Sequence, residues 1–180
     1  MPKITRTSRE SIANYLGFTT NDLLDAYGSG DHIPGSGSAA ALSALLAFEL
    51  LRTVCILSLR KKTYEAVHKE LREILRNIEE VYRPRMRRLF DEDIRVFRLV
   101  SANRILRDAA VTPTERDRYN RVALRHQRTA TTVPIQICET AFEALELAIR
   151  VYDIGFKSAR GDSGVAISNL LSSVSGSLFI

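Results

Sequence analysis

The sequence is poor in the residues that build disulfide frameworks and metal sites. It contains two cysteines and three histidines in 180 residues, and no Cys-x-x-Cys pair or Cys/His cluster occurs. A disulfide scaffold or a structural zinc site needs several such residues at short spacing. Cys55 and Cys138 both lie in apolar stretches, so we expect buried free thiols and a function that uses no metal.

The sequence also has little that points to secretion or to a membrane. Its first residues contain no apolar segment of the kind that forms a secretory signal, so we expect a cytoplasmic protein. The single long hydrophobic run, residues 39–59, carries Glu49 and Arg52 near its middle. Each charge disfavours insertion by about 2.5–3.5 kcal/mol at the centre of a bilayer. We therefore expect a central helix of a soluble bundle and no membrane partner.

Strand patterns are absent as well, because no stretch of appreciable length alternates apolar and polar residues. Apolar residues instead recur at three- and four-residue spacing along most of the chain. Capping signals open helices at Thr7, Thr19 and Thr112, and Gly155 is expected to end one. We predict an all-α fold, a mostly antiparallel up-and-down helical bundle, in one domain over residues 1–180.

Two prolines fall inside the longest helical patterns. The apolar spacing continues across Pro84 and Pro134, so we expect kinks there rather than helix ends. The final helix is expected to begin near Asp162, which would act as its N-cap residue.

Basic residues outnumber acidic ones by 26 to 21, which gives a net charge of +5 and a pI near 9.5. Such a balance suggests an anionic partner. The surplus lies mainly in residues 60–107, where it is interleaved with acidic residues, as in Glu65 with Lys69. This pattern is typical of a solvated helix face. Without a helix-turn-helix, an aromatic platform or a basic tail, we do not expect a nucleic-acid partner.

One long glycine-rich loop precedes the apolar helix. Its end turns directly into that helix through Pro34, Gly35, Ser36, Gly37 and Ser38, the last of which is expected to cap the helix. Backbone N–H groups and the positive end of a helix dipole can receive an anionic or carbonyl oxygen at such a turn. A tight turn that only lets two helices pack closely explains the same residues equally well.

Carboxylates supply the candidate proton-transfer groups. In the run of residues 91–93, at most one or two can face the same site, and a solvated face is the alternative. Asp162 is either a helix cap or a catalytic carboxylate, if it meets the glycine-rich loop in space. His32, within that loop, either moves protons near neutral pH or is merely solvated.

Two lysines, Lys61 and Lys62, directly follow the apolar helix. They either stabilise its negative C-terminal end or hold an anionic substrate. The sequence leaves both interpretations open.

Several separated motifs, in order along residues 23–179, resemble the cyclodeaminase/cyclohydrolase family: formiminotetrahydrofolate cyclodeaminases and methenyltetrahydrofolate cyclohydrolases. The family patterns are similar to four segments: P-G-G-G-S-x-A-A to residues 34–41, G-K-K-x-Y to residues 60–64, D-E-D-A-x-A-F to residues 91–97, and G-N-x-x-A-x-S-D-x-G-V-A-A to residues 155–167.

The resemblance implies an all-helical homodimer that binds a reduced folate, a tetrahydrofolate derivative, at the glycine-rich loop. It implies either cyclisation of formiminotetrahydrofolate with release of ammonia or hydrolysis of methenyltetrahydrofolate. On this basis residues 34–38 would bind the substrate, and Asp93 and Asp162 would transfer protons. Lys61 and Lys62 would hold the anionic glutamate tail of the folate.

Three positions depart from the family patterns: Ser36 replaces a glycine, Phe156 an asparagine and Gly161 a serine. The chain given also ends, at Ile180, inside what resembles the family's closing helix. Because these changes fall where ligand contacts are expected, an alternative function remains open. The chain would then be a divergent non-catalytic member that acts as a helical dimeric binding or assembly module.

Overall fold

The computed structural model describes residues 14–180, and within this range it contains helices and no strands. The all-α prediction is confirmed. Six α-helices follow one another in this part of the chain: α1 Thr20–Gly28, α2 Ser36–Leu59, α3 His68–Asn77, α4 Arg83–Ala109, α5 Pro113–Ile154 and α6 Arg160–Ser177.

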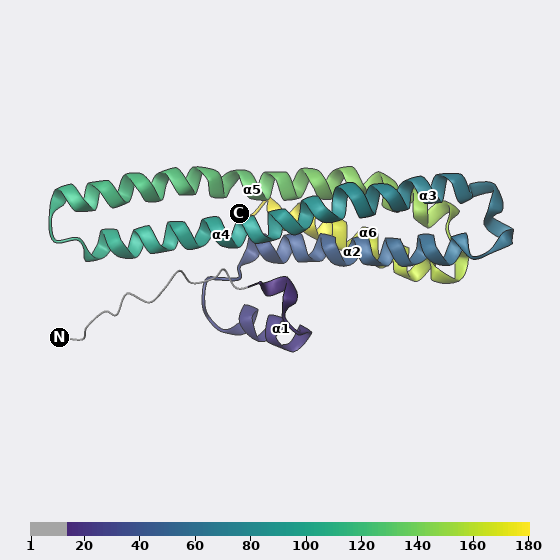
Figure 1. Ribbon diagram of the computed structural model, residues 1–180, viewed down its shortest axis with the longest axis horizontal. Helices are drawn as coiled ribbons and strands as arrows, with labels where there is room; N and C mark the ends of the chain where they lie inside the picture. Colours follow the sequence, from purple (N-terminus) through teal and green to yellow (C-terminus); the bar gives the residue numbers. More distant parts are fainter. Residues whose placement is uncertain (1–13) are drawn as a thin grey trace.

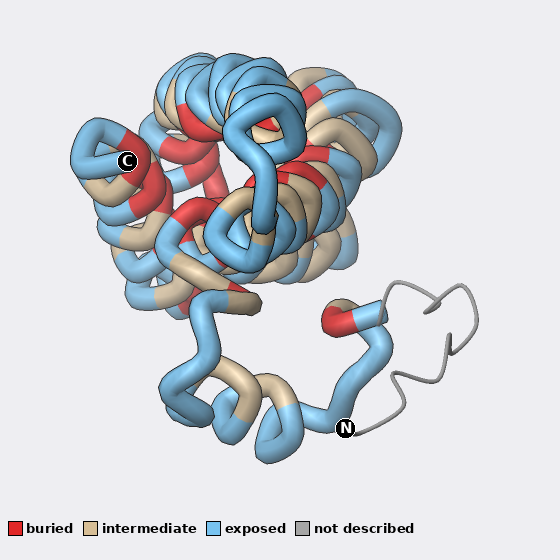
Figure 2. The backbone as a smooth tube through the Cα atoms, turned by 90° about the vertical axis from the view of Figure 1, so that its left-hand side faces the viewer, coloured by how far each residue is buried: buried red, intermediate tan, exposed pale blue. Residues whose placement is uncertain are grey.

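The long helices run up and down along one axis (Figure 1). Helix α2 runs in one direction, α3 and α4 return, α5 runs back, and α6 lies antiparallel beside α2. Residues buried in the bundle lie where these helices face one another (Figure 2). One end of the α4–α5 pair projects beyond the other helices, and short α1 lies outside the bundle near the start of α2. The predicted antiparallel bundle is confirmed.

Helix α2 forms the centre of the core. Ala44, Ala47, Phe48, Leu51 and Val54 are fully buried, and the alanines allow neighbouring backbones to approach closely. Burying a large apolar side chain such as Phe48 contributes about 1.5–3 kcal/mol. By length and composition α2 could cross a membrane, but half of its most apolar 18-residue window is buried against the rest of the chain. A core helix of a globular protein has this property.

The two charges within α2 are paired across helices. Glu49 accepts a hydrogen bond from Nε of Arg83 at 2.5 Å, and Nε of Arg52 donates to Glu79 at 2.6 Å. Arg52 and Glu49 also lie 3.7 Å apart. The charges therefore tie α2 to the α3–α4 segment at the surface.

Most predicted helix boundaries are confirmed. The hydroxyl of Thr19 accepts a hydrogen bond from the Asp22 N–H, and Thr112 with Glu115 forms a capping box. Gly155 is the C-cap residue of α5, where the backbone becomes extended, and a Cβ there would lie only 2.5 Å from the Val151 carbonyl oxygen. The helix start predicted at Thr7 lies outside the described residues.

Both prolines lie in helices that continue across them. Pro84 follows a π-helical turn, Ile78–Tyr82, which joins α3 to α4 without a break. Such a turn changes the hydrogen-bond pattern where proline has no N–H to donate. Pro134 lies buried within α5. The predicted continuation of both helices is confirmed.

Two local predictions were wrong. Helix α6 begins at Arg160, and Asp162 is its third residue, because a 3₁₀ turn over Lys157–Ala159 leads directly into the helix. Both cysteines are free, but only one is buried: Cys138 is half-exposed. Burial raises the pKa of the Cys55 thiol to about 12, which makes it unreactive.

Candidate functional site

The glycine-rich loop is held by the hydroxyl of a buried serine. Helix α2 begins at Ser36 with Gly35 as its N-cap residue, so the capping expected of Ser38 is made from the third position of the helix and not from the N-cap position. Ser38 instead reaches back: its hydroxyl accepts from the Gly35 N–H at 3.1 Å and donates to the Gly35 carbonyl at 2.9 Å. The Tyr27 hydroxyl donates to the Ser38 hydroxyl oxygen at 3.2 Å, which ties α1 to the loop.

A carboxylate from α4 completes the start of α2. Oδ2 of Asp93 accepts a hydrogen bond from the Ser38 N–H at 2.8 Å. Its carboxylate also lies over Gly37, where an added Cβ would overlap it. Burial raises the pKa of Asp93, and the Ser38 N–H, which stabilises the charged form, opposes that rise. The structure therefore fixes one carboxylate of the run 91–93 against the glycine-rich loop.

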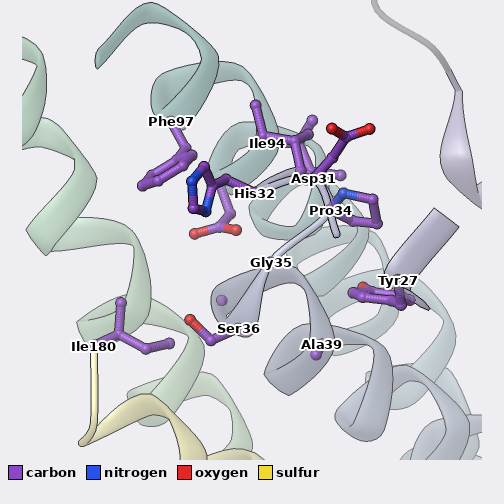
Figure 3. Close-up of a pocket in the computed structure, with 13 residues that line it drawn as sticks. Tyr27, Asp31, His32, Pro34, Gly35, Ser36, Ala39, Ile94, Phe97 and Ile180 are labelled. Atoms are coloured by element: carbon purple, nitrogen blue, oxygen red, sulfur yellow. The ribbon is translucent and has the colours of Figure 1, made fainter. Parts of the chain in front are cut away.

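A pocket of about 470 Å³ opens beside this carboxylate (Figure 3). The labelled side chains come from α1, the loop, α2, α4 and, after α6, Ile180, and both His32 and Phe97 belong to the pocket wall. Ser36 points towards Ile180 across the pocket. The lining residues are Tyr27, Asp31, His32, Ile33, Pro34, Gly35, Ser36, Gly37, Ala39, Asp93, Ile94, Phe97 and Ile180.

The pocket has a negative character. Its charged lining side chains, among the described residues, are Asp31 and Asp93, and apolar walls come from Ile94 and Phe97. Among the hydrogen bonds of residues 14–180, none uses the N–H of Ser36 or Gly37. Those two groups remain able to donate to a ligand oxygen. The pocket thus offers a carboxylate and free amides on the same side.

Of the predicted site residues, Pro34, Gly35, Ser36, Gly37 and Asp93 line the pocket together. Ser38, also predicted to bind substrate, is fully buried and supports the loop from behind. Asp93 is thus the predicted catalytic residue that meets the predicted loop residues in the pocket. Three other predicted residues, Lys61, Lys62 and Asp162, lie elsewhere.

Lys61 and Lys62 lie at the opposite end of α2. The helix has 24 residues, which corresponds to about 35 Å at 1.5 Å per residue. Asp162 is distant too, because α6 meets the start of α2 at Gly176, where an added Cβ would lie 3.7 Å from the Cβ of Ala40. The fourteen residues from Gly176 back to Asp162 span about 20 Å of helix. Within one chain, these residues do not share a site with Asp93.

The three departures from the family pattern leave the pocket open. Ser36 is exposed at its rim. Phe156 lies at the far end of α2, with its ring 6.0 Å from that of Tyr64 and 5.3 Å below the Lys61 ammonium. Gly161 is exposed, and a Cβ there would meet nothing within 4 Å. Of these three residues, Ser36 alone lines the pocket.

Seven residues that line the pocket were not predicted from the sequence: Tyr27, Asp31, Ile33, Ala39, Ile94, Phe97 and Ile180. The spacing of Asp93 and Phe97 on one helix was a usable signal, since residues four apart share a face. His32 was recognised as ambiguous, and the structure places it in the pocket wall. Within residues 14–180, no three His, Cys, Asp or Glu side chains gather in a way that would hold a metal ion.

Comparisons with known proteins agree on one family. The family model described as Formiminotransferase-cyclodeaminase matches residues 19–180. Methenyltetrahydrofolate cyclohydrolase of Methylorubrum extorquens is 30% identical over 153 residues, which cover 83% of this chain and 70% of the relative. The crystal structure of formiminotetrahydrofolate cyclodeaminase from Thermotoga maritima has a TM-score of 0.69 at 18% identity, over 91% of this chain and 78% of that one. At that identity the likeness concerns the fold.

Proposed function

Because the chain belongs to the formiminotransferase-cyclodeaminase family, we propose that its pocket binds a reduced folate and hydrolyses methenyltetrahydrofolate. The observation that carries this proposal is the half-buried Asp93 carboxylate, fixed by the Ser38 N–H beside an open pocket. The 30% identical relative favours this reaction over others of the family. A cytoplasmic location is part of the same proposal.

The charge of the pocket suits the substrate. The carbon that reacts in methenyltetrahydrofolate belongs to a cationic amidinium, and carboxylates stabilise such a cation at short range. Asp31 and Asp93 are the charged groups of the pocket wall among the described residues. Ile94 and Phe97 provide an apolar surface for a planar ring system.

Asp93 would act as the general base. As the oxygen of a water molecule bonds to the methenyl carbon, a proton of that water passes to the carboxylate. The bond between that carbon and N5 then breaks as N5 receives this proton from the carboxylate and the hydroxyl group loses its own, which leaves a formyl group on N10. One proton is released overall. The raised pKa of Asp93 brings its proton affinity closer to that of the groups with which it exchanges protons.

The backbone at the start of α2 would stabilise the intermediate. The tetrahedral carbon formed by water addition carries an oxygen with increased negative charge. The N–H groups of Ser36 and Gly37 are free to donate to that oxygen within the described structure. The Asp93 carboxylate would therefore activate the water, and the loop N–H groups would stabilise the intermediate that follows.

Cyclisation of formiminotetrahydrofolate with release of ammonia is the second candidate, favoured by the description of the family model. There N10 attacks the formimino carbon, and a proton must reach the departing nitrogen. The same carboxylate would carry that proton. A non-catalytic role is not favoured, because the pocket keeps its carboxylate and stays open despite Ser36.

The exposed face of α2 supports a homodimer as part of the proposal. Residues at helical spacing along it are exposed or half-exposed, and all but one are apolar: Ala39, Leu42, Leu46, Leu50, Thr53 and Leu57. A second copy that packs antiparallel on this stripe would bury it. Such pairing would also bring each Lys61 towards the glycine-rich loop of the other copy.

Absorbance and ammonia measurements on the purified protein separate the two reactions. Hydrolysis removes the absorbance of methenyltetrahydrofolate, whereas cyclisation of formiminotetrahydrofolate creates it and releases one ammonia for each turnover. We expect the first activity. A protein that converts neither compound and binds neither would contradict the proposed function.

A further inference from the structure

A second groove continues from the pocket along the seam between α4 and α5. It has a volume of about 140 Å³ and shares Asp93, Phe97 and Ile180 with the pocket. Beyond these residues it is lined by Val100, Arg104, Gln127, Ala130 and Thr131. The two cavities therefore adjoin, and the path along them leads from Asp93 over Phe97.

The lining of the groove changes along its length from acidic to apolar to basic. Asp93, Phe97, Val100 and Arg104 follow one face of α4, at spacings of four, three and four residues. The path therefore runs from a carboxylate over two apolar side chains to a guanidinium. The eleven residues from Asp93 to Arg104 span about 16 Å of helix.

The guanidinium of Arg104 is held in position at the end of the groove. Its Nη2 donates a hydrogen bond to Oε1 of Gln127 on α5, at 3.1 Å. This contact directs the side chain across the seam and leaves its other N–H groups available. Besides Asp93, Arg104 is the charged residue of this groove in the part of the chain that the structure describes.

We propose that the groove binds the p-aminobenzoylglutamate tail of the folate and that Arg104 holds a carboxylate of its glutamate. The inference rests on the proposed function and extends it to the recognition of the tail. A reduced folate carries a cationic centre in its methenyl form, then an aromatic ring, then carboxylates. The path offers Asp93, then Phe97 and Val100, then Arg104, in the same order.

This assignment replaces the role expected for Lys61 and Lys62 within one chain. Those lysines lie about 35 Å from the loop along α2, whereas Arg104 lies in a groove that adjoins the pocket. Arg104 also presents a planar fork of donors that matches a carboxylate. The structure thus provides a nearer cation for the tail.

The test compares Arg104→Gln with Arg95→Gln. Arg95 lies on the opposite side of α4, where it pairs with Glu92, so its substitution removes the same charge away from the groove. We expect Arg104→Gln to raise KM for methenyltetrahydrofolate about tenfold or more, with kcat within about twofold, since a charge-assisted hydrogen bond is lost. Arg95→Gln should leave both constants unchanged, and Arg104→Lys should restore part of the loss.

Binding of p-aminobenzoylglutamate and p-aminobenzoate, measured by calorimetry, gives a readout that does not need turnover. The first compound carries the glutamate and the second lacks it. We expect Arg104→Gln to weaken only the first, and circular dichroism to show the wild-type helix content. Unchanged KM and unchanged binding of p-aminobenzoylglutamate in Arg104→Gln would overturn the inference.

The failure of the proposed function looks different from the failure of this inference. If the wild type binds p-aminobenzoylglutamate through Arg104 but converts neither folate, the groove is supported and the proposed reaction is wrong. If the wild type converts a folate and Arg104→Gln behaves like Arg95→Gln, the reaction stands and the groove assignment is wrong. A wild type that fails to bind p-aminobenzoylglutamate also contradicts the assignment.

Discussion

Asp93 of α4 lies directly against Gly37 of α2, and its carboxylate occupies the space that a side chain at Gly37 would need. The same carboxylate accepts a hydrogen bond from the next residue's N–H, that of Ser38. Two helices that are distant in sequence therefore meet at the start of α2. The glycine is required by the proximity of the carboxylate rather than by its own backbone angles.

Substitution Gly37→Ala tests this contact. The new methyl group would push the Asp93 carboxylate away, so we expect kcat to fall at least about tenfold, as for misplacement of a catalytic group. Alanine within a helix is favoured over glycine by about 1 kcal/mol, which offsets part of the clash. Steady-state kinetics and thermal melting measure the two effects.

The matched control is Gly161→Ala in the first turn of α6. A Cβ there meets nothing within 4 Å, so activity should not change and the Tm should rise slightly. If Gly37→Ala retained wild-type kcat, the carboxylate would not need its observed position.

The stability of the protein should depend on pH through Asp93. Burial raises its pKa in the folded state, so the folded state binds a proton more tightly than the unfolded chain. This group therefore adds stability as the pH falls through its folded pKa, and the gain is lost as the pH rises through that value. Asp93→Asn removes this dependence and the cost of a half-buried charge.

Thermal melting of wild type and Asp93→Asn, from about pH 4 to pH 7, measures this effect. We expect the variant to be at least as stable as wild type at pH 7, and the difference to shrink on acidification. A variant that is much less stable at pH 7 would show that the carboxylate serves mainly to hold the fold together.

Removal of the Tyr27 hydroxyl should loosen the loop. This group donates to the Ser38 hydroxyl, which in turn fixes Gly35. We expect Tyr27→Phe to lower the free energy of unfolding by about 1 kcal/mol, the usual contribution of one hydrogen bond. We also expect a higher KM, because the loop forms the pocket wall.

Urea denaturation and steady-state kinetics measure both effects. Tyr119→Phe, on α5 and away from the pocket, serves as the control. Wild-type values of KM and stability in Tyr27→Phe would exclude a role of α1 in holding the loop.

The dimer proposal predicts that a charge on the α2 stripe separates the two copies. Leu46 is 57% exposed in the single chain, and it lies at the middle of the stripe. We expect Leu46→Glu to be monomeric by light scattering, with unchanged helix content. Val111→Glu, at the turn between α4 and α5 and 93% exposed, should keep the wild-type mass. Equal masses for all three proteins would contradict an interface on this face.

Local signals in the sequence predicted the helices better than they predicted the site. Thr19 and Thr112 cap their helices through residues three positions away, so the pattern alone was sufficient. At Ser38 the local pattern was not sufficient, because the carboxylate that accepts the hydrogen bond of its N–H belongs to Asp93 of α4, 55 residues away. The start of α6 was missed for a related reason, since the 3₁₀ turn before Asp162 has no capping signature.

The arrangement of the bundle decided which predicted residues meet. Asp93 reaches the loop because α4 crosses the start of α2, which the periodicity of neither helix reveals. The separation of Lys61 from the loop was present in the sequence, since 24 helical residues between them span about 35 Å. Helix length, applied to motifs at its two ends, would have excluded a site shared within one chain.

The most direct test of the proposed chemistry is the kcat of Asp93→Asn for methenyltetrahydrofolate, measured beside that of Glu92→Gln. The neighbouring Glu92 pairs with Arg95 at the surface, so its variant controls for the loss of a carboxylate on the same turn. We predict that Asp93→Asn lowers kcat by about 10²–10⁴, the contribution of a general base, and that Glu92→Gln keeps the wild-type value. Wild-type kcat in a correctly folded Asp93→Asn protein would contradict the assignment of Asp93 as the base.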